Sequence, residues 1–365
     1  MNFASNTLSV QAGAPGAYFD ENKDEIRSVI VELEQRLLQN KLTTNQKMMQ
    51  DARARFIACR RQNDAGKKRN ATPCKNQFLD FDGVAELDDG DFMTKGTFLE
   101  KRWSKDGVEN RMAFGDFDIQ SYKNGSTTSS INGRLVWERY KYDNAMFGRY
   151  ISGTFGVSKL RGIFEGTQRR YGVGAGAYFV AQLDEALFGD AHISGHLVKN
   201  SFSMEDGTLS LDGDYLTRKF TVGGALTGVI EYEGFELRPE LAYNYGKTFI
   251  GNVDLNGQSW GLTDSGLKLD SEIVSVSRLT LRPEFYFSAA EFLDLVDNAM
   301  FTFSPRYICE RLSPNEATQS CGQGFEFGFS NQSDDGLMKI SISYQVDHLH
   351  NDKTSTLEFS FGLNF

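Results

Sequence analysis

Residues 355–365 read STLEFSFGLNF, and this stretch decides the fold of the chain. Every second residue is apolar and those between are polar or glycine, a period of two that predicts a β-strand with one apolar face. The apolar row consists of Leu357, Phe359, Phe361, Leu363 and Phe365. In water, a strand with such a face and an open edge would aggregate. In a closed barrel its edges are paired and its apolar face meets lipid, so the stretch predicts a transmembrane β-barrel.

The composition fits a membrane barrel and excludes other classes. Of the 365 residues 40% are hydrophobic, and the mean hydropathy is −0.42. No run approaches the roughly 18 apolar residues of a transmembrane helix. In a barrel, polar residues facing the lumen dilute every strand, and aromatic residues form girdles, which accounts for 29 Phe and 14 Tyr. The alternative is a soluble β-sandwich. A net charge of −10 argues against nucleic acid as a partner.

The chain changes character near residue 77. We expect residues 1–19 to be a flexible lead-in, 20–61 a helix, 62–77 a basic, disulfide-bearing connector and 78–365 the barrel. Within 20–61, apolar residues recur every three or four positions. Such a helix, about 60 Å long, would exceed the thickness of a bilayer. It either threads the barrel or packs on a soluble domain as an amphipathic helix or coiled-coil stub. Residues 1–20 lack the features of a signal peptide, so we expect that signal to lie upstream.

From residue 78 onward, amphipathic segments long enough to cross a bilayer alternate with turn signals. Connections at 142–146, 183–187, 232–234 and 332–336 are short, whereas those at 161–169, 203–214, 251–272 and 310–322 are generally longer. In bacterial barrels short turns lie in the periplasm and longer loops outside, which places the C-terminus in the periplasm. We count twelve strands from about Arg111. A further hairpin at 78–103 would give fourteen.

Two local features bear on the barrel wall. Pro239 and Pro283 lie in repeated Leu-Arg-Pro-Glu segments, and because proline removes a ladder donor we expect each at a bulge or strand end. Four cysteines, in two close pairs, are typical of an exported protein with disulfides. Three pairings are possible, and the barrel topology favours the two local ones. Zinc binding is a poor alternative, since the spacing is wrong and no histidine is near. The favoured pairs are Cys59–Cys74 and Cys309–Cys321.

The order of these parts resembles the translocator domain of the classical autotransporters, over roughly residues 20–365. The segments SSINGRLVWERY (129–140), YGVGAGAYFVAQL (171–183) and FELRPELAYNYGK (235–247) have the strand texture of that family. The resemblance implies a 12-stranded barrel in the bacterial outer membrane, a helix in its lumen and a covalently linked N-terminal passenger. It also implies that the barrel assembly machinery reads the row Leu357–Phe365. Two features depart from the family: no passenger is present, and Asn40 and Asn45 do not form the paired-Asn junction of self-cleaving members.

Charged residues on the polar faces of the predicted strands are the main candidates for a functional role. Buried charges must be paired or hydrated. We therefore expect these side chains either to dock the helix by salt bridges or to line a water-filled channel. They are Arg134, Glu138, Arg238, Glu240, Arg278, Arg282, Glu284 and Glu358.

His192, Ser194 and His196 share one polar face with Asp190, a set that an enzyme could use. A catalytic site needs groups from several strands, so we interpret the stripe as hydrated lumen lining and predict no enzyme, cofactor or metal. His348 and His350 are expected to be solvated near a loop, with metal binding there as the alternative. The functional alternative to export is a stand-alone barrel, acting as a plugged channel or as a surface structural or adhesion protein.

Overall fold

The computed structural model describes residues 15–66, 78–88, 90–103, 109–141, 144–161, 164–289, 298–313, 318–333, 337–349 and 352–364. In these ranges a helix, α1 (Pro15–Gly66), precedes a long series of antiparallel strands. The strands are β1 (Phe78–Asp88), β2 (Asp91–Trp103), β3 (Glu109–Ser121), β4 (Thr127–Lys141), β5 (Ala145–Leu160), β6 (Glu165–Asp184), β7 (Leu187–Glu205), β8 (Ser210–Gly228), β9 (Ile230–Tyr232), β10 (Phe235–Ile250), β11 (Val253–Ser259), β12 (Leu262–Leu269), β13 (Glu272–Ser288), β14 (Ala299–Ser313), β15 (Thr318–Gln332), β16 (Met338–Leu349) and β17 (Asp352–Asn364).

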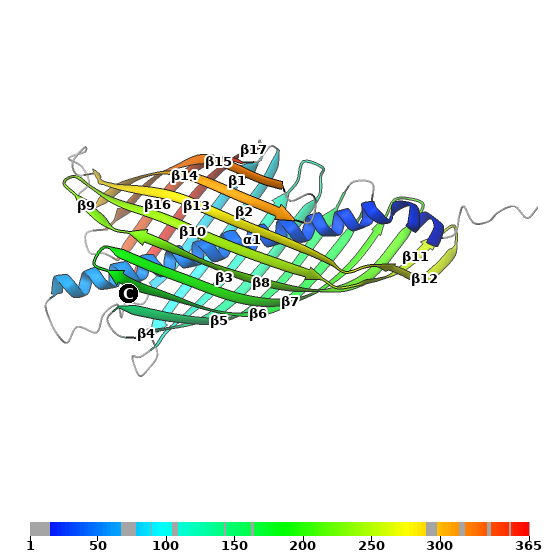
Figure 1. The fold of residues 1–365 in the computed structure, drawn as a ribbon, viewed down its shortest axis with the longest axis horizontal. Coiled ribbons are helices and arrows are strands. Elements are labelled where there is room, and N and C mark those ends of the chain that lie inside the picture. The colour runs from blue at the N-terminus through cyan, green and yellow to red at the C-terminus, as the bar shows by residue number, and fades with distance from the viewer. Residues whose placement is uncertain are drawn as a thin grey trace, which may run out of the picture.

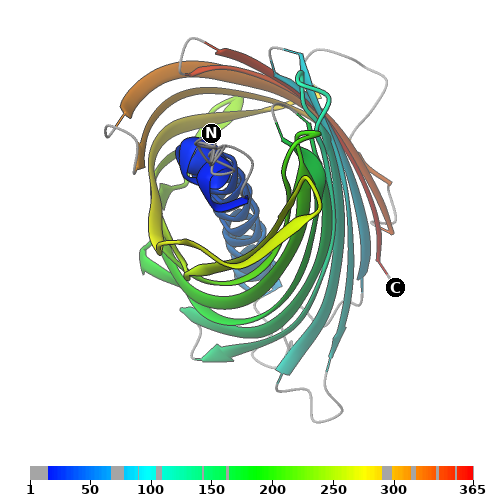
Figure 2. The ribbon, with the colours of Figure 1, turned by 90° about the vertical axis from the view of Figure 1, so that its right-hand side faces the viewer.

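The sheet closes on itself into a barrel (Figure 2). Strand β1 pairs with β2 on one edge and with β17 on the other, where Phe81 lies opposite Phe361. Three of the 17 segments prolong a neighbour: β9 extends β8, β11 extends β10 and β12 extends β13. The described wall therefore has 14 strands. The residues 78–103 supply β1 and β2, which confirms the fourteen-strand alternative, and the preferred count of twelve is too low.

Alternation along each strand separates an apolar outer face from a polar or helix-contacting inner face. Many large apolar side chains on the outside are about 40–65% exposed, as at Ile131 (63%), Leu197 (51%) and Phe359 (49%). Their neighbours in sequence point inward and are largely buried, as at Glu138 and Asn200. This is the arrangement predicted from residues 355–365 for a transmembrane barrel. Phe365 itself lies outside the described residues. In the helix 15–66, no segment is long and apolar enough to cross a membrane.

Helix α1 lies inside the barrel and follows its long axis (Figures 1 and 2). It begins at the end of the barrel where β11 and β12 lie, here called the hairpin end, and runs to the opposite end near β9, the turn end. Pro15 suits the first turn of a helix, where its missing N–H is not needed. The 52 residues span about 78 Å. The threaded arrangement is confirmed, and the helix extends beyond the predicted 20–61 on both sides.

Three prolines lie side by side in the wall. Pro239 on β10 is the register partner of Pro283 on β13. On β14, Pro305 occupies the position opposite Pro283, because Leu281 pairs with Tyr307 and Phe285 with Phe303 while the positions between them do not pair. The ladder is also interrupted on the other side of β10, between β8 and β9. Pro239 and Pro283 therefore lie inside strands, unlike our expectation, and the wall accommodates them as breaks in pairing.

The cysteines of the second pair form a disulfide. Cys309 on β14 and Cys321 on β15 are directly opposite each other in the register, with Cα atoms 4.0 Å apart. The bond thus joins two paired strands, instead of lying in the predicted loop 310–322. Of the predicted pair Cys59–Cys74, Cys74 lies outside the described residues, so the pairing stays a prediction; His350 also lies outside them.

Candidate functional site

The lumen is filled by α1, which packs against the inner wall through two apolar clusters. Near the hairpin end, helix residues meet side chains of β8, β11, β12 and β13; the helix contributes Phe19, Ile26, Ile30, Val31, Leu38 and Leu42. Towards the turn end, a second cluster joins the helix to β2–β7, with Met48, Met49, Ala52, Phe56 and Ile57 on the helix side. Because apolar packing excludes water, both clusters close the lumen around the helix.

Arg53 of the helix is almost completely buried. Its guanidinium pairs with the carboxylates of Asp190 on β7 and Glu240 on β10, and all three side chains are nearly inaccessible to solvent. Arg282 on β13 lies 3.5 Å from Glu240, and the Gln50 amide donates to Glu240 at 3.2 Å. Two carboxylates and two guanidinium groups thus balance in charge. A buried cluster of this kind fixes the position of the helix, because losing one member would leave an uncompensated charge.

A second buried pair lies one half-turn along the helix. Arg55 contacts the Glu138 carboxylate of β4 at 2.7 Å. The other partners of Glu138 are wall residues: the Tyr178 hydroxyl donates to it at 2.6 Å and the Asn110 amide at 2.9 Å. The carboxylate is completely buried and accepts hydrogen bonds on both oxygens, as a buried ion requires.

Further polar contacts hold the helix at other heights. Lys47 pairs with Glu358 on β17 and lies 3.6 Å from Asp82 on β1. Nearer the hairpin end, Glu34 of the helix receives Lys219 at 2.8 Å and the Tyr215 hydroxyl at 3.2 Å. Contacts therefore reach β1, β7, β8, β10 and β17, so the helix is fixed around much of the barrel circumference.

A mixed cluster involves β13 and β14. Arg278 pairs with Glu310 at 2.6 Å and also donates to the Thr43 hydroxyl of the helix at 3.1 Å. The Gln39 amide of the helix donates to Glu310 at 2.8 Å. Neutral helix side chains here meet an ion pair that the wall already completes, so this contact adds hydrogen bonds without burying a helix charge.

The eight lumen charges predicted from the sequence divide into three groups. Glu138, Glu240 and Glu358 pair with helix cations, and Arg278 reaches Thr43. Arg134 and Arg282 lie beside these contacts: the guanidinium of Arg134 is 3.2 Å from the Met48 sulfur, and Arg282 supports Glu240. The remaining two form contacts within the wall. They are Arg238, which stacks over Tyr286 and pairs with Glu236, and Glu284, which is 4.0 Å from Arg282.

Sequence reasoning missed several docking residues. Glu310 and Lys219 were not singled out, and Asp190 was considered only as part of a catalytic set. Each lies on an inward row, which alternation could have identified. On the helix, Glu34, Lys47 and Arg53 could not be identified from the sequence, because the spacing of three or four positions identifies only apolar residues.

The stripe on β7 lines the lumen, where its polar groups contact other wall residues and the helix. Ser194 exchanges a hydrogen bond with Thr221 at 2.6 Å, and Thr221 receives the Asn45 amide of the helix at 2.9 Å. His196 contacts the Ser152 hydroxyl at 3.2 Å. Within the described residues, neither ring nitrogen of His192 has a hydrogen-bond partner. The carboxylate of Asp190 pairs with Arg53 and does not orient a histidine towards Ser194.

The fold and the filled lumen define a transmembrane β-barrel plugged by its own N-terminal helix. No family model and no curated protein matches the chain. Among solved structures, it is similar to the translocator domain of autotransporter NalP from Neisseria meningitidis, with 12% identity and a TM-score of 0.47 over 88% of this chain and 97% of that chain. For the β domain of the Bordetella autotransporter BrkA the identity is 12% and the TM-score 0.45, over 80% and 99%. The chain also resembles the monoaromatic hydrocarbon channel CymD, with 9% identity and a TM-score of 0.51 over 80% and 88%.

Proposed function

We propose that this protein is the translocator unit of an autotransporter, which exports a passenger attached ahead of residue 1 across the bacterial outer membrane. The observation that carries the proposal is the threaded helix. Its first residues lie at the hairpin end and its last residues at the turn end, where β1 begins. Any segment joined to the N-terminal side of α1 therefore continues outward from the hairpin end, as an exported passenger would.

We infer the orientation from the β11–β12 extension. Two-residue connections occur at both ends, between β6 and β7 at the turn end and between β1 and β2 at the hairpin end, whereas the β11–β12 extension projects at the hairpin end. We place the turn end in the periplasm and the hairpin end outside, following the rule for bacterial barrels. Lipid then surrounds the apolar outer face. The row Leu357–Phe365 on the last strand is the element we expect the barrel assembly machinery to read.

After export, the docked helix seals the pore. The buried pairs Arg53–Asp190 and Arg55–Glu138 form only when the helix has its observed register in the lumen. These contacts would retain the helix once the passenger lies outside and would prevent leakage. The barrel itself supplies no covalent step in this scheme.

A reporter fusion tests export. A compact reporter domain, placed behind a signal sequence and ahead of residue 1, should become accessible to protease added to intact cells. In the matched control the same reporter precedes a barrel that lacks residues 15–66, and there it should stay protected. A reporter that remains periplasmic while the complete barrel inserts would contradict the proposal.

The second candidate is a stand-alone barrel with a permanent plug, serving as a regulated channel or a surface structural or adhesion protein. Ion pairs at several heights of the helix favour it, because they suit a plug that is built to stay. The fusion experiment separates the two candidates. A stand-alone barrel would insert with its helix in place and leave the reporter behind.

A further inference from the structure

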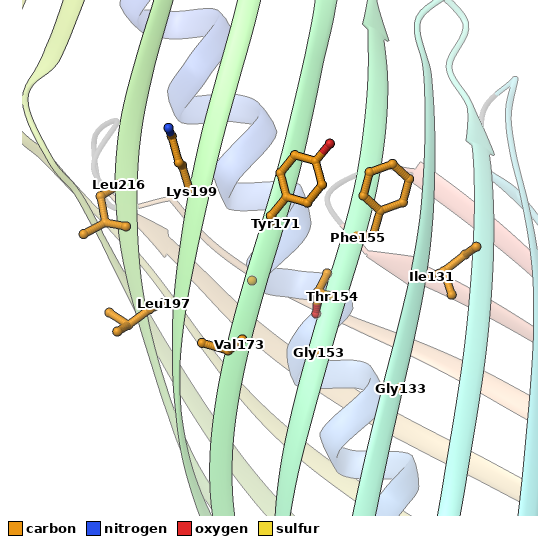
Figure 3. Close-up of a pocket in the computed structure, with 11 residues that line it drawn as sticks. Ile131, Gly133, Gly153, Thr154, Phe155, Tyr171, Val173, Leu197, Lys199 and Leu216 are labelled. Carbon is orange, nitrogen blue, oxygen red and sulfur yellow. The ribbon is translucent and has the colours of Figure 1, made fainter.

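The outer wall carries a groove that faces lipid. It has a volume of about 610 Å³ and runs over β4–β8, with Gly133 and Gly153 at its floor and large side chains around it (Figure 3). Its lining is almost entirely apolar; the principal residues are Ile131, Phe155, Tyr171, Val173, Leu197 and Leu216. Its volume lies within the roughly 300–1,000 Å³ that is typical of small-molecule sites.

The groove results from the register of adjacent strands, which places two glycines side by side. Gly133 lies directly opposite Gly153, Gly153 opposite Val173, and Val173 opposite Leu197, so one row across four strands begins with two positions that lack side chains. The next row towards the hairpin end is bulky, with Ile131, Phe155 and Tyr171 in adjacent strands. A Cβ atom built on Gly153 meets no atom within 4 Å. The floor is therefore open space on the lipid side, not a cleft that neighbouring side chains fill.

Cations flank the groove: Lys199 and Arg169 lie towards the hairpin end, and Arg218 lies level with the floor, opposite Leu197. Lys199 lines the groove itself. Arg169 and Arg218 are exposed on the same outer face, each one diagonal step from Lys199 in the ladder. Among the described residues, no ion pair includes Arg169 or Arg218. Lys199 is 3.4 Å from Asp214, but both side chains are more than half exposed, and such a pair is weak enough for a phosphate to displace.

We propose that this groove binds an acyl chain of a phosphate-bearing glycolipid in the outer leaflet, of the lipid A type. The chain lies over Gly133 and Gly153, and the phosphate is held by Lys199, Arg169 and Arg218. Charge complementarity carries the choice of occupant, because lysine and arginine at the edge of a membrane bind anionic headgroups. Phe155 and Tyr171, whose ring centroids are 5.2 Å apart, sit at the level where aromatic residues meet headgroups. The assignment rests on the proposed orientation, which puts the hairpin end outside.

Native mass spectrometry of the complete refolded chain in detergent micelles tests the site. The probes are bisphosphorylated lipid A, the same lipid without phosphates, and phosphatidylethanolamine. We expect one tightly retained lipid A. Gly153→Leu should weaken its binding about tenfold by filling the floor, an effect comparable to removing two methylene groups from apolar contact. Gly83→Leu is the matched control: it adds the same side chain at another open outward glycine on β1, and should bind as the wild type does.

The charged half is tested separately with Lys199→Gln and Arg218→Gln, which change exposed side chains and leave the fold intact. Both should weaken binding of bisphosphorylated lipid A and leave the dephosphorylated lipid unaffected. The proposal is overturned if Gly153→Leu retains lipid A like Gly83→Leu, or if lipid A binds no better than its dephosphorylated form or phosphatidylethanolamine. Neither result would touch the export proposal, because passenger export is scored by the reporter and not by lipid retention.

Discussion

At the scale of single residues, Arg53 decides whether the helix stays in place. Arg53→Gln would leave the buried carboxylates of Asp190 and Glu240 with too little positive charge. Removing one partner of a buried ion pair destabilises a protein by about 3–5 kcal/mol. We expect a loss of this size in the free energy of unfolding, measured by urea titration of the refolded barrel in detergent.

The control for Arg53 is on the same helix. Arg27 contacts Asp24, which is almost fully exposed, and lies 3.9 Å from the partly exposed Glu272 of β13, so Arg27→Gln should change stability by less than about 1 kcal/mol. Adding Asp190→Asn alone to Arg53→Gln removes the excess negative charge and leaves Glu240 paired with Arg282, so this double variant should regain most of the loss. Equal behaviour of the two arginine variants would show that the buried cluster does not hold the helix.

Asp206, in the turn between β7 and β8, makes the start of the helix sensitive to acid. Burial raises the pKa of its carboxyl, but hydrogen bonds from the Leu209 amide, the Tyr18 hydroxyl and the Thr208 amide outweigh burial and lower the pKa. Stability from a lowered carboxyl pKa is present above the unfolded value of about 3.9 and is lost as pH falls through the folded value. Between about pH 5 and pH 2, pepsin should therefore cut more readily near Tyr18.

Tyr18→Phe provides the comparison for this pH effect. The variant lacks the 2.7 Å hydrogen bond from the tyrosine hydroxyl to Asp206, so cleavage should already be raised at the upper end of the range. The ratio of variant to wild-type cleavage corrects for the pH dependence of pepsin itself. A ratio that stays at one over the whole range would count against a role for this contact.

At the scale of elements, the disulfide between β14 and β15 joins strands that are already paired. The two cysteines are 12 residues apart, and closing a loop of similar length stabilises a folded chain by about 2–3 kcal/mol. The double variant Cys309→Ser, Cys321→Ser should lower the free energy of unfolding by that amount, with an unchanged urea dependence. Chemical reduction is a poorer test, because it would also act on the predicted pair Cys59–Cys74. An unchanged midpoint would mean that the ladder alone fixes the two strands.

The strands and the helix also show which features of the fold can be predicted from the sequence. Alternation over 355–365 correctly predicts which side chains face lipid, and the same rule places Glu138, Glu240 and Glu358 in the lumen. It does not predict their partners, because Arg53 meets Asp190 across 137 residues of chain. That contact depends on the rotation of the helix and on the stagger of the strands, neither of which is local. Arg238 and Glu284 share the inward rows and yet contact wall residues, for the same reason.

The number of strands is the second feature that was difficult to predict from the sequence. The residues 78–103 carry more charge and weaker alternation than later strands, and thus looked optional beside the twelve segments from Arg111. In the barrel, β1 and β2 close the ring between β17 and β3. A strand that is required to close the ring can have weak apolar–polar alternation, because pairing on both edges satisfies the hydrogen-bonding groups of its backbone.

At the scale of the whole molecule, the helix determines whether the barrel conducts ions. We expect the complete chain to be nearly closed in a planar bilayer, because α1 and its two apolar clusters fill the lumen. A chain without residues 1–66 should conduct strongly, and Arg53→Gln should open briefly and repeatedly. Equal conductance with and without the helix would mean that the helix does not remain in the pore in a membrane.

The barrel wall should deform most easily at the row formed by Pro239, Pro283 and Pro305. At this level three adjacent strands each lack a backbone donor, and the pairing of β13 with β14 is interrupted. A barrel in which one group of neighbouring strands is more easily deformed does not widen evenly. When a bulky segment occupies the lumen, we expect the barrel to become oval towards β13 and β14 and to recover afterwards, with the opposite wall, β2–β4, keeping its shape.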